Sequence, residues 1–183
     1  MSNVFLFSYI CLFLIVVINS YMTITIYRKA LIRKSKDYLH ENERGIPNNT
    51  VFPILNFRTL DEKAFNIVDL DKKGTIVLFT SITCDACKSL YPTLNTFVKK
   101  HKHINFLLLI ASDSITNVKQ MLSEYDLNDV PTSHLSAKDA SILESSIYPF
   151  GYYLKPDGTV NYKGVVNKGD LELLLRLGFL EAS

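Results

Sequence analysis

The sequence predicts an α/β domain, in which helices flank a central mixed sheet, preceded by a single N-terminal transmembrane helix. Three features support this: a long uncharged N-terminal segment, continuous apolar runs of strand length, and amphipathic segments of helical period between those runs. We therefore expect a transmembrane anchor at residues 1–27, a charged linker at 28–50 and the folded domain at 51–183.

The N-terminal segment carries no charged side chain between residues 4 and 27. As a helix it would extend for about 36 Å, enough to cross a hydrocarbon core of about 30 Å with some tilt. A buried core helix is rarely apolar on every face over this length, and a cleavable signal peptide has a charged start and a shorter apolar region. We expect a retained anchor in contact with membrane lipid, and Cys11 within it is expected to be a packing or lipid-facing thiol.

Charge gives two further expectations. No basic residue precedes the anchor, whereas several lie between residues 28 and 36, so the positive-inside rule places the folded domain in the cytoplasm. The formal net charge is only +2, and no broad cationic face is evident, so nucleic acid is not an expected partner.

The first half of the domain alternates strands with a helix. "FNIVDL" predicts a strand at residues 65–70, and the apolar runs "TIVLFTS" and "NFLLLIA" predict strands at 75–81 and 105–111 that are covered on both faces. Between the last two, residues 87–101 carry apolar side chains at helical spacing. This predicts a βαβ unit with a right-handed crossover.

The second half completes the sheet. A helix is predicted at residues 114–127, and Pro131 is expected to open the strand that follows it. A hairpin is predicted at 150–166 with Pro156, Asp157 and Gly158 in its turn, followed by an amphipathic helix at 168–180. This order of elements resembles that of a thioredoxin-like domain.

The segment "SITCDACKSLYP" places Cys84 and Cys87 where a buried strand leads into a helix. Free backbone N–H groups and the positive end of the helix dipole stabilise a thiolate at such a position. We therefore predict that Cys84 is an exposed catalytic nucleophile. Cys87, one turn further on, is predicted to resolve the mixed disulfide that Cys84 forms.

Two other interpretations of the cysteine pair are weaker. A zinc site needs four ligands, and the chain has one CxxC and scattered histidines, of which His101 and His103 lie about 21 Å from Cys87 by helical rise. An inert pair of core cysteines is the other alternative. We expect no metal and no cofactor, and we favour redox chemistry.

Two charged residues at the motif are expected to tune the thiol. A carboxylate at Asp85, about 6 Å from a thiolate at Cys84, would oppose its formation by roughly 2–3 kcal/mol at an effective dielectric near 20. This predicts a more reducing pair, with Lys88 offsetting part of the effect. Alternatively, Asp85 is only an early-helix acid that interacts favourably with the dipole.

The segment "SIYPFGYYL" carries the predicted substrate groove. In thioredoxin-like domains a cis-proline opens the strand opposite the cysteine pair, and Pro149 has this position by resemblance. Tyr148 would then line the groove and offer its backbone to a substrate strand. An ordinary trans turn proline is the alternative.

These segments together resemble membrane-anchored thioredoxin-like proteins of the MauD and TlpA-like type. "LFTSITCDACKSLYP" is similar to that group's strand, CxxC and helix, and "GYYLKPDGTVNYKGVVNKGDLELLL" is similar to its last hairpin and helix. The resemblance implies a thiol-disulfide oxidoreductase with Cys84 and Cys87 as its redox pair. It also implies an extracytoplasmic domain, in conflict with the positive-inside rule, and we favour the resemblance on this point.

The expected partners are a protein substrate with cysteines and a membrane-embedded or thioredoxin-like electron partner. Two residues depart from the family pattern: Asp85 stands where the group often has proline, and Leu78 where thioredoxin has a buried acid. These departures leave the direction of electron flow open. The alternative function is a non-catalytic binding or maturation module that docks a partner in the same groove.

Overall fold

The computed structural model describes residues 2–38, 44–144, 146–167 and 170–180, which divide between two units, Met1–Tyr38 and Leu39–Ser183. The first unit is the helix α1, Ser2–Tyr38. Its segment Phe7–Ile26 is long and apolar enough to cross a membrane, and none of that segment is buried within the protein. The expected division of the chain at residues 27 and 50 stays a prediction, and residues 39–43 of the expected linker lie outside the described residues.

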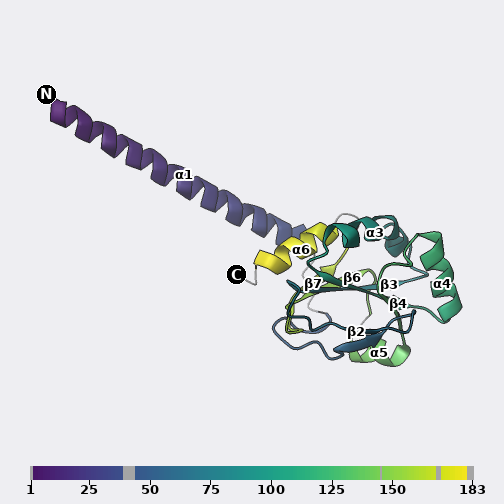
Figure 1. The fold of residues 1–183 in the computed structure, drawn as a ribbon. Coiled ribbons are helices and arrows are strands. Elements are labelled where there is room, and N and C mark those ends of the chain that lie inside the picture. The colour runs from purple at the N-terminus through teal and green to yellow at the C-terminus, as the bar shows by residue number, and fades with distance from the viewer. Residues whose placement is uncertain (1, 39–43, 145, 168–169, 181–183) are drawn as a thin grey trace. The chain divides into compact units, whose positions relative to one another are not determined.

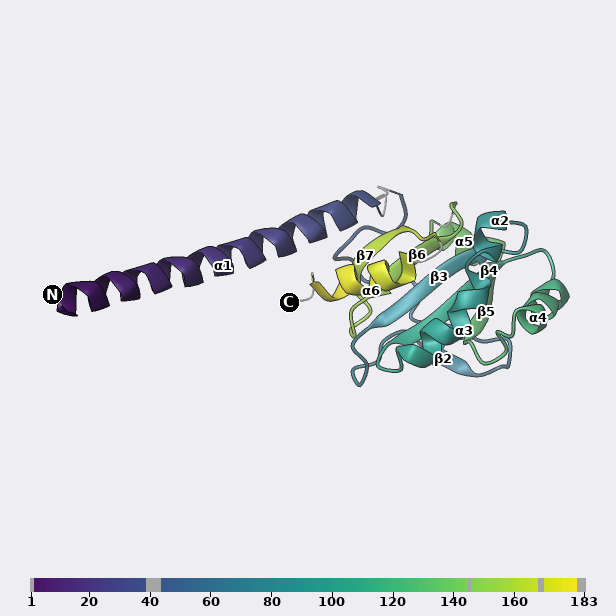
Figure 2. The ribbon, with the colours of Figure 1, turned by 90° about the horizontal axis from the view of Figure 1, so that it is seen from above.

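The second unit is built on a five-stranded mixed sheet with strand order β5-β4-β3-β6-β7 (Figures 1 and 2). β4 pairs in parallel with β3 and β5, whereas β6 pairs antiparallel with β3 and β7. The central strand β3 is buried along its length because both faces of the sheet are covered, as its continuous apolar run predicts. The strands are β3 (Thr75–Ser81), β4 (Asn105–Ala111), β5 (Thr132–Leu135), β6 (Phe150–Leu154) and β7 (Val160–Val165).

Helices and a small second sheet cover the two faces. Figures 1 and 2 show α3 and α6 over one face, with α5 and the short β1–β2 sheet over the other. On the latter face Val77, Phe79 and Tyr152 form part of one core cluster. The remaining elements are α2 (Asp85–Lys88), α3 (Tyr91–Lys100), α4 (Ile115–Glu124), α5 (Ala137–Ile142), α6 (Asp170–Leu180), β1 (Asn56–Arg58) and β2 (Ala64–Asn66).

The strand predicted at residues 65–70 is only partly correct. β2 ends at Asn66 and pairs with β1 outside the main sheet. The Asn66 side chain accepts a hydrogen bond from the Val68 amide, and the Asp69 side chain accepts one from Asp71. These local side-chain bonds replace ladder bonds and turn the chain.

The helix predicted at residues 87–101 is two helices. α2 ends at Lys88, and α3 begins at Tyr91 with Pro92 in its first turn. A proline there lacks the N–H that would continue the hydrogen bonding of α2, so the chain restarts as a new helix. The break matters for the site because it separates the four residues of α2 from the longer α3.

Residues 44–50, which the sequence assigns to the linker, contact the sheet in the structure. Ile46 is buried, and its amide donates to the Tyr152 hydroxyl at 3.2 Å. Lys163 of β7 donates from its buried Nζ to the Gly45 carbonyl at 3.0 Å. The Val160 amide donates to the Thr50 carbonyl at 2.9 Å. This segment therefore packs as part of the second unit.

Candidate active site

Cys84 lies where the central strand delivers the chain to the first helix of the βαβ unit. β3 ends at Ser81, and Cys84 has an extended backbone (φ −91°, ψ 112°) as the residue that caps α2. The Cys87 amide donates to the Cys84 Sγ at 3.3 Å, as an N-cap side chain requires. Because α2 has only four residues, its dipole effect is smaller than that of the longer helix predicted from the sequence.

The two sulfurs of the motif have different surroundings. Cys84 is partly exposed, whereas Cys87 is fully buried, and both thiols are free. Burial raises the pKa of the Cys87 thiol, and the neighbouring Cys84 raises it further. The burial therefore makes Cys84 the sulfur that a partner can reach, and it keeps Cys87 protonated at neutral pH.

Asp85 and Lys88 form an ion pair with each other on the surface beside Cys84. Lys88 Nζ lies 2.8 Å from Asp85 Oδ1, and this bond lowers the pKa of the Asp85 carboxyl. The carboxylate is almost fully exposed. Its effect on a thiolate is therefore smaller than that of a lone acid, because Lys88 and solvent both screen it. The assigned role of these two residues in tuning the thiol stays a prediction.

The loop before β6 faces the cysteine pair. The Tyr148–Pro149 peptide bond is cis, which is the geometry expected by resemblance, and the Cys84 thiol donates to the Tyr148 carbonyl at 3.6 Å. Pro131 directly precedes β5 as expected. The structure thus brings Cys84, Cys87, Tyr148 and Pro149 together, and their functional roles stay predictions.

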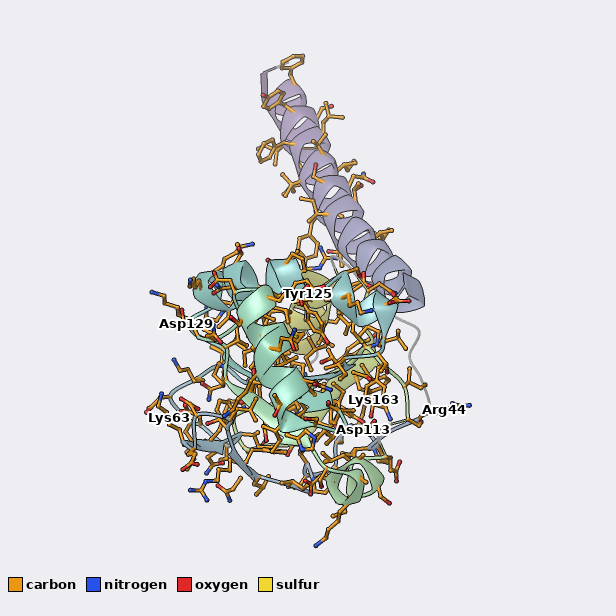
Figure 3. All side chains as sticks on the ribbon, turned by 90° about the vertical axis from the view of Figure 1, so that its right-hand side faces the viewer. Arg44, Lys63, Asp113, Tyr125, Asp129 and Lys163 are labelled. Carbon is orange, nitrogen blue, oxygen red and sulfur yellow. The ribbon has the colours of Figure 1, made fainter. Side chains whose placement is uncertain are left out.

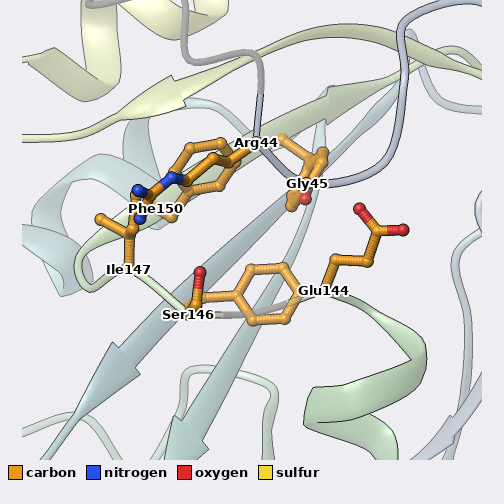
Figure 4. A pocket seen from close by; sticks show the side chains of 8 residues that line it. Arg44, Gly45, Glu144, Ser146, Ile147 and Phe150 are labelled. Atoms are coloured by element: carbon orange, nitrogen blue, oxygen red, sulfur yellow. The ribbon is translucent and has the colours of Figure 1, made fainter.

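A small pocket lies beside this loop on the opposite side from the helices α3 and α6. It is lined by residues from the 44–45 segment and from the loop that leads to the cis-proline. Figure 4 shows the Arg44 side chain extending toward Ile147, with Glu144 on the Gly45 side. The loop that carries Tyr148 is therefore packed against the segment that enters the domain.

The histidines in the described part of the chain lie away from the cysteines. His101 Nε2 lies 2.9 Å from Glu172 at the far end of α3, and His134 Nε2 lies 2.6 Å from the Ser112 carbonyl. No group of three potential metal ligands occurs among the residues that the structure describes.

One residue near the site was missed by sequence reasoning. Tyr91, the first residue of α3, is fully buried, and its hydroxyl donates to the Ser81 carbonyl at 3.3 Å. The same carbonyl accepts the Cys84 amide at 3.2 Å. Leu78, where thioredoxin has an acid, is fully buried. The sequence signal for Tyr91 was a polar side chain four residues after Cys87 in an otherwise apolar helix face.

This site, a CxxC that opens a helix opposite a cis-proline on a mixed sheet, defines a thioredoxin-like protein. The family model described as Thioredoxin matches residues 56–147, about half of the chain, and the chain therefore belongs to the thioredoxin family. The match confirms the expected fold.

The comparisons also identify particular relatives. The chain is 29% identical over 106 residues to the methylamine utilization protein MauD of Methylorubrum extorquens, covering 57% of this chain and 50% of that protein. It is 24% identical over 103 residues to the thiol-disulfide oxidoreductase ResA of Oceanobacillus iheyensis, covering 55% and 54%. The chain thus spans about half the length of the curated relatives it matches.

Among solved structures, the chain is similar to the thioredoxin domain of a thiol-disulfide oxidoreductase from Bacteroides vulgatus. The TM-score is 0.61 at 16% identity, over 74% of this chain and 98% of that domain. At this identity the similarity supports the fold. The expected resemblance to MauD-like thioredoxin proteins is confirmed by the sequence matches.

Proposed function

We propose that the protein is a membrane-anchored thiol-disulfide oxidoreductase that exchanges disulfides with a cysteine-containing partner protein. The observation that carries this proposal is the contrast within the CxxC. The Cys84 sulfur is accessible and accepts the Cys87 amide at 3.3 Å, while the Cys87 sulfur is buried behind it.

The reaction begins when the Cys84 thiolate attacks a disulfide of the partner. A new bond forms between Cys84 and one partner sulfur, and the other partner sulfur leaves as a thiolate. The partner chain lies along the loop at Tyr148 and Pro149, where the proline has no N–H to donate. Cys87 then attacks Cys84, which oxidises the pair and releases the second partner sulfur. The partner disulfide is thereby reduced by two electrons.

Reduction of the partner is the proposed direction. A buried Cys87 with a raised pKa disfavours the thiolate form of the reduced pair, so the dithiol is a good electron donor. Equilibration with glutathione buffers should give a potential closer to the value of about −270 mV for thioredoxin than to about −120 mV for DsbA. A potential near the second value would reverse the direction.

The anchor and the electron partner belong to the same proposal. Phe7–Ile26 holds the domain at a membrane, outside the cytoplasm, where a membrane-embedded or thioredoxin-like partner returns electrons to the pair. A membrane-impermeant thiol reagent applied to intact cells should label Cys84. Labelling only after cell lysis would place the domain in the cytoplasm, as the basic residues after the anchor favour.

The function is tested by trapping the intermediate. In full-length protein with Cys11→Ser, the Cys87→Ser variant should accumulate a mixed disulfide with its partner, because the resolving sulfur is missing. Non-reducing electrophoresis and mass spectrometry would identify the adduct on Cys84, and Cys84→Ser is the matched control. Function retained in Cys84→Ser, with no adduct in Cys87→Ser, would instead favour a non-catalytic binding module.

A further inference from the structure

The resolving step requires a negative charge on a buried sulfur. Cys87 is fully buried, and a thiolate there is costly unless a hydrogen-bond donor faces it. Along β3, Val77 and Phe79 face the core cluster, so Leu78 and Thr80 alternate onto the other face. Leu78 can neither accept a proton nor donate a hydrogen bond. The Ser81 and Cys87 backbone groups lower the pKa of the sulfur, and a side-chain donor would add to their effect.

Tyr91 is placed to supply this donor. It follows Cys87 by four residues, across the break between α2 and α3, and burial, followed by the nearby Cys87 and Cys84 sulfurs, raises the pKa of its hydroxyl. The hydroxyl is thus protonated at neutral pH and available as a donor. Its present bond to the Ser81 carbonyl, at 3.3 Å, is long for an O–H donor. That carbonyl also accepts the Cys84 amide, so it keeps a partner if the Tyr91 hydroxyl turns away.

Thr80 completes the arrangement. It is fully buried, and within the described parts of the chain its hydroxyl oxygen has no hydrogen-bond partner. It lies next to the Tyr91 hydroxyl and lowers the pKa of that group, the direction that a donor to the phenol oxygen produces. An unpartnered buried hydroxyl needs a physical reason. Its place beside the Tyr91 phenol oxygen supplies that reason, because a hydroxyl there can donate to Tyr91.

From this geometry we infer that the Tyr91 hydroxyl donates a hydrogen bond to the Cys87 sulfur as that sulfur becomes a thiolate, with Thr80 donating in turn to Tyr91. The inference rests on the proposed function, because the step is the resolution of the mixed disulfide. Cys87 loses its proton to solvent, its sulfur bonds to Cys84, and the bond between Cys84 and the partner sulfur breaks. The partner leaves as a thiolate and takes up a proton.

The two steps can be timed separately with an aromatic disulfide reagent whose released thiolate absorbs visible light. Reduced full-length protein in detergent, with Cys11→Ser, should release one aromatic thiolate when Cys84 attacks and a second when Cys87 resolves. Tyr91→Phe should slow the second release roughly tenfold, the effect of one hydrogen bond to a charged group. It should also move the alkaline rise of that rate to higher pH by about one unit.

Controls separate a hydrogen bond from packing. Tyr125, at the end of α4 (Figure 3), packs its ring 5.2 Å from that of Tyr91, so Tyr125→Phe removes a neighbouring hydroxyl without touching the proposed donor. This variant should resolve at the wild-type rate. Thr80→Val keeps the side-chain shape and should slow the second release by about threefold, less than the loss of the direct donor.

The two releases distinguish the role of Tyr91 from the proposed function as a whole. The first release should stay within about twofold of wild type in every variant, which also shows that the site is intact. An unchanged second release and pH profile in Tyr91→Phe would overturn the inference and leave the proposed function standing. Equal slowing by Tyr125→Phe would overturn it as well. Absence of any first release would contradict the proposed function itself.

Discussion

The two ends of α3 carry polar clusters of opposite character. At its last turn, Glu172 of α6 accepts Lys100 at 2.6 Å and His101 at 2.9 Å, so this carboxylate has two partners. At its first residue, the buried Tyr91 lies near the partly exposed Cys84, the buried Cys87 and the buried Thr80 hydroxyl.

The two ends of α3 therefore differ in role: one end pairs with α6, and the other lies near the reactive sulfurs. Paired charges between α3 and α6 hold two elements together and gain little from changing partners. Buried groups with unused hydrogen-bonding capacity are costly in a resting structure, and they are retained where a later state uses them. The contrast predicts that substitutions at the first end change reactivity and that those at the second end change stability.

The largest effect is expected from the cysteine that begins the site. Cys84→Ser should reduce disulfide exchange to the uncatalysed rate, because no other described thiol is both accessible and placed opposite Tyr148. His101→Gln, at the opposite end of α3, should leave exchange within about twofold of wild type. Exchange with a fluorescent glutathione disulfide measures both. Comparable losses in the two variants would remove the contrast.

A packing change on α6 should affect stability alone. A Cβ at Gly178 would overlap the ring of Tyr153, so Gly178→Ala forces a shift of the helix or the ring. Such overpacking costs about 2 kcal/mol, which lowers the Tm of a protein of this size by roughly 4–8 °C. Ser123→Ala on the exposed side of α4 is the matched control. Thermal unfolding measures the shift, and the reactivity of Cys84 should not change.

The pH dependence of stability should also differ between the two ends of α3, with the acid limb set by Glu172 and the alkaline limb by Cys87. The Glu172 carboxyl has a pKa lowered by Lys100 and then by His101, so its contribution is present above about pH 4.5 and is lost as the pH falls. The Cys87 thiol has a raised pKa, so its contribution is present below about pH 9 and is lost as the pH rises.

Two variants test this division. Glu172→Gln should flatten only the acid limb of a Tm–pH curve. In reduced protein, Cys87→Ala should reduce the loss of unfolding free energy between about pH 9 and pH 10. The reduction is at most about 1.4 kcal/mol, the contribution of one titrating group over one pH unit. An unchanged alkaline limb in Cys87→Ala would show that the thiol is solvated.

The smallest effect is expected from the surface ion pair beside Cys84. Asp85→Asn removes the acid and leaves the Lys88 cation facing the sulfur, so alkylation of Cys84 at neutral pH should accelerate about twofold to threefold at low salt. Lys88→Gln should slow it, and high salt should shrink both changes. Equal rates in the two variants would mean that the pair has no influence on the thiol.

The sequence predicts the frame of the site well because strong local signals define it. Continuous apolar runs identify β3 and β4, the turn residues identify the β6–β7 hairpin, and the resemblance identifies Pro149. The failures come where the deciding contacts are distant. The short β1 strand and α5 were not predicted, since three to six residues carry little periodic signal.

Tyr91 illustrates the remaining limit. In sequence its only signal is one polar side chain in an apolar helix face, next to the proline that restarts the helix. Its importance comes from burial and from the Ser81 carbonyl that it shares with Cys84, which are facts of tertiary structure. The same holds for Ile46 and Gly45, whose contacts with β6 and β7 join an apparent linker to the sheet.

The division of roles between Cys84 and Cys87 is tested most directly by comparing the alkylation rates of the two thiols. Reduced full-length protein, treated briefly with iodoacetamide at neutral pH and analysed by peptide mass spectrometry, should carry the label on Cys84 at least about 100 times faster than on Cys87. That result would establish one accessible sulfur backed by one buried sulfur. Comparable rates, or faster labelling of Cys87, would contradict the division of roles on which the proposed exchange depends.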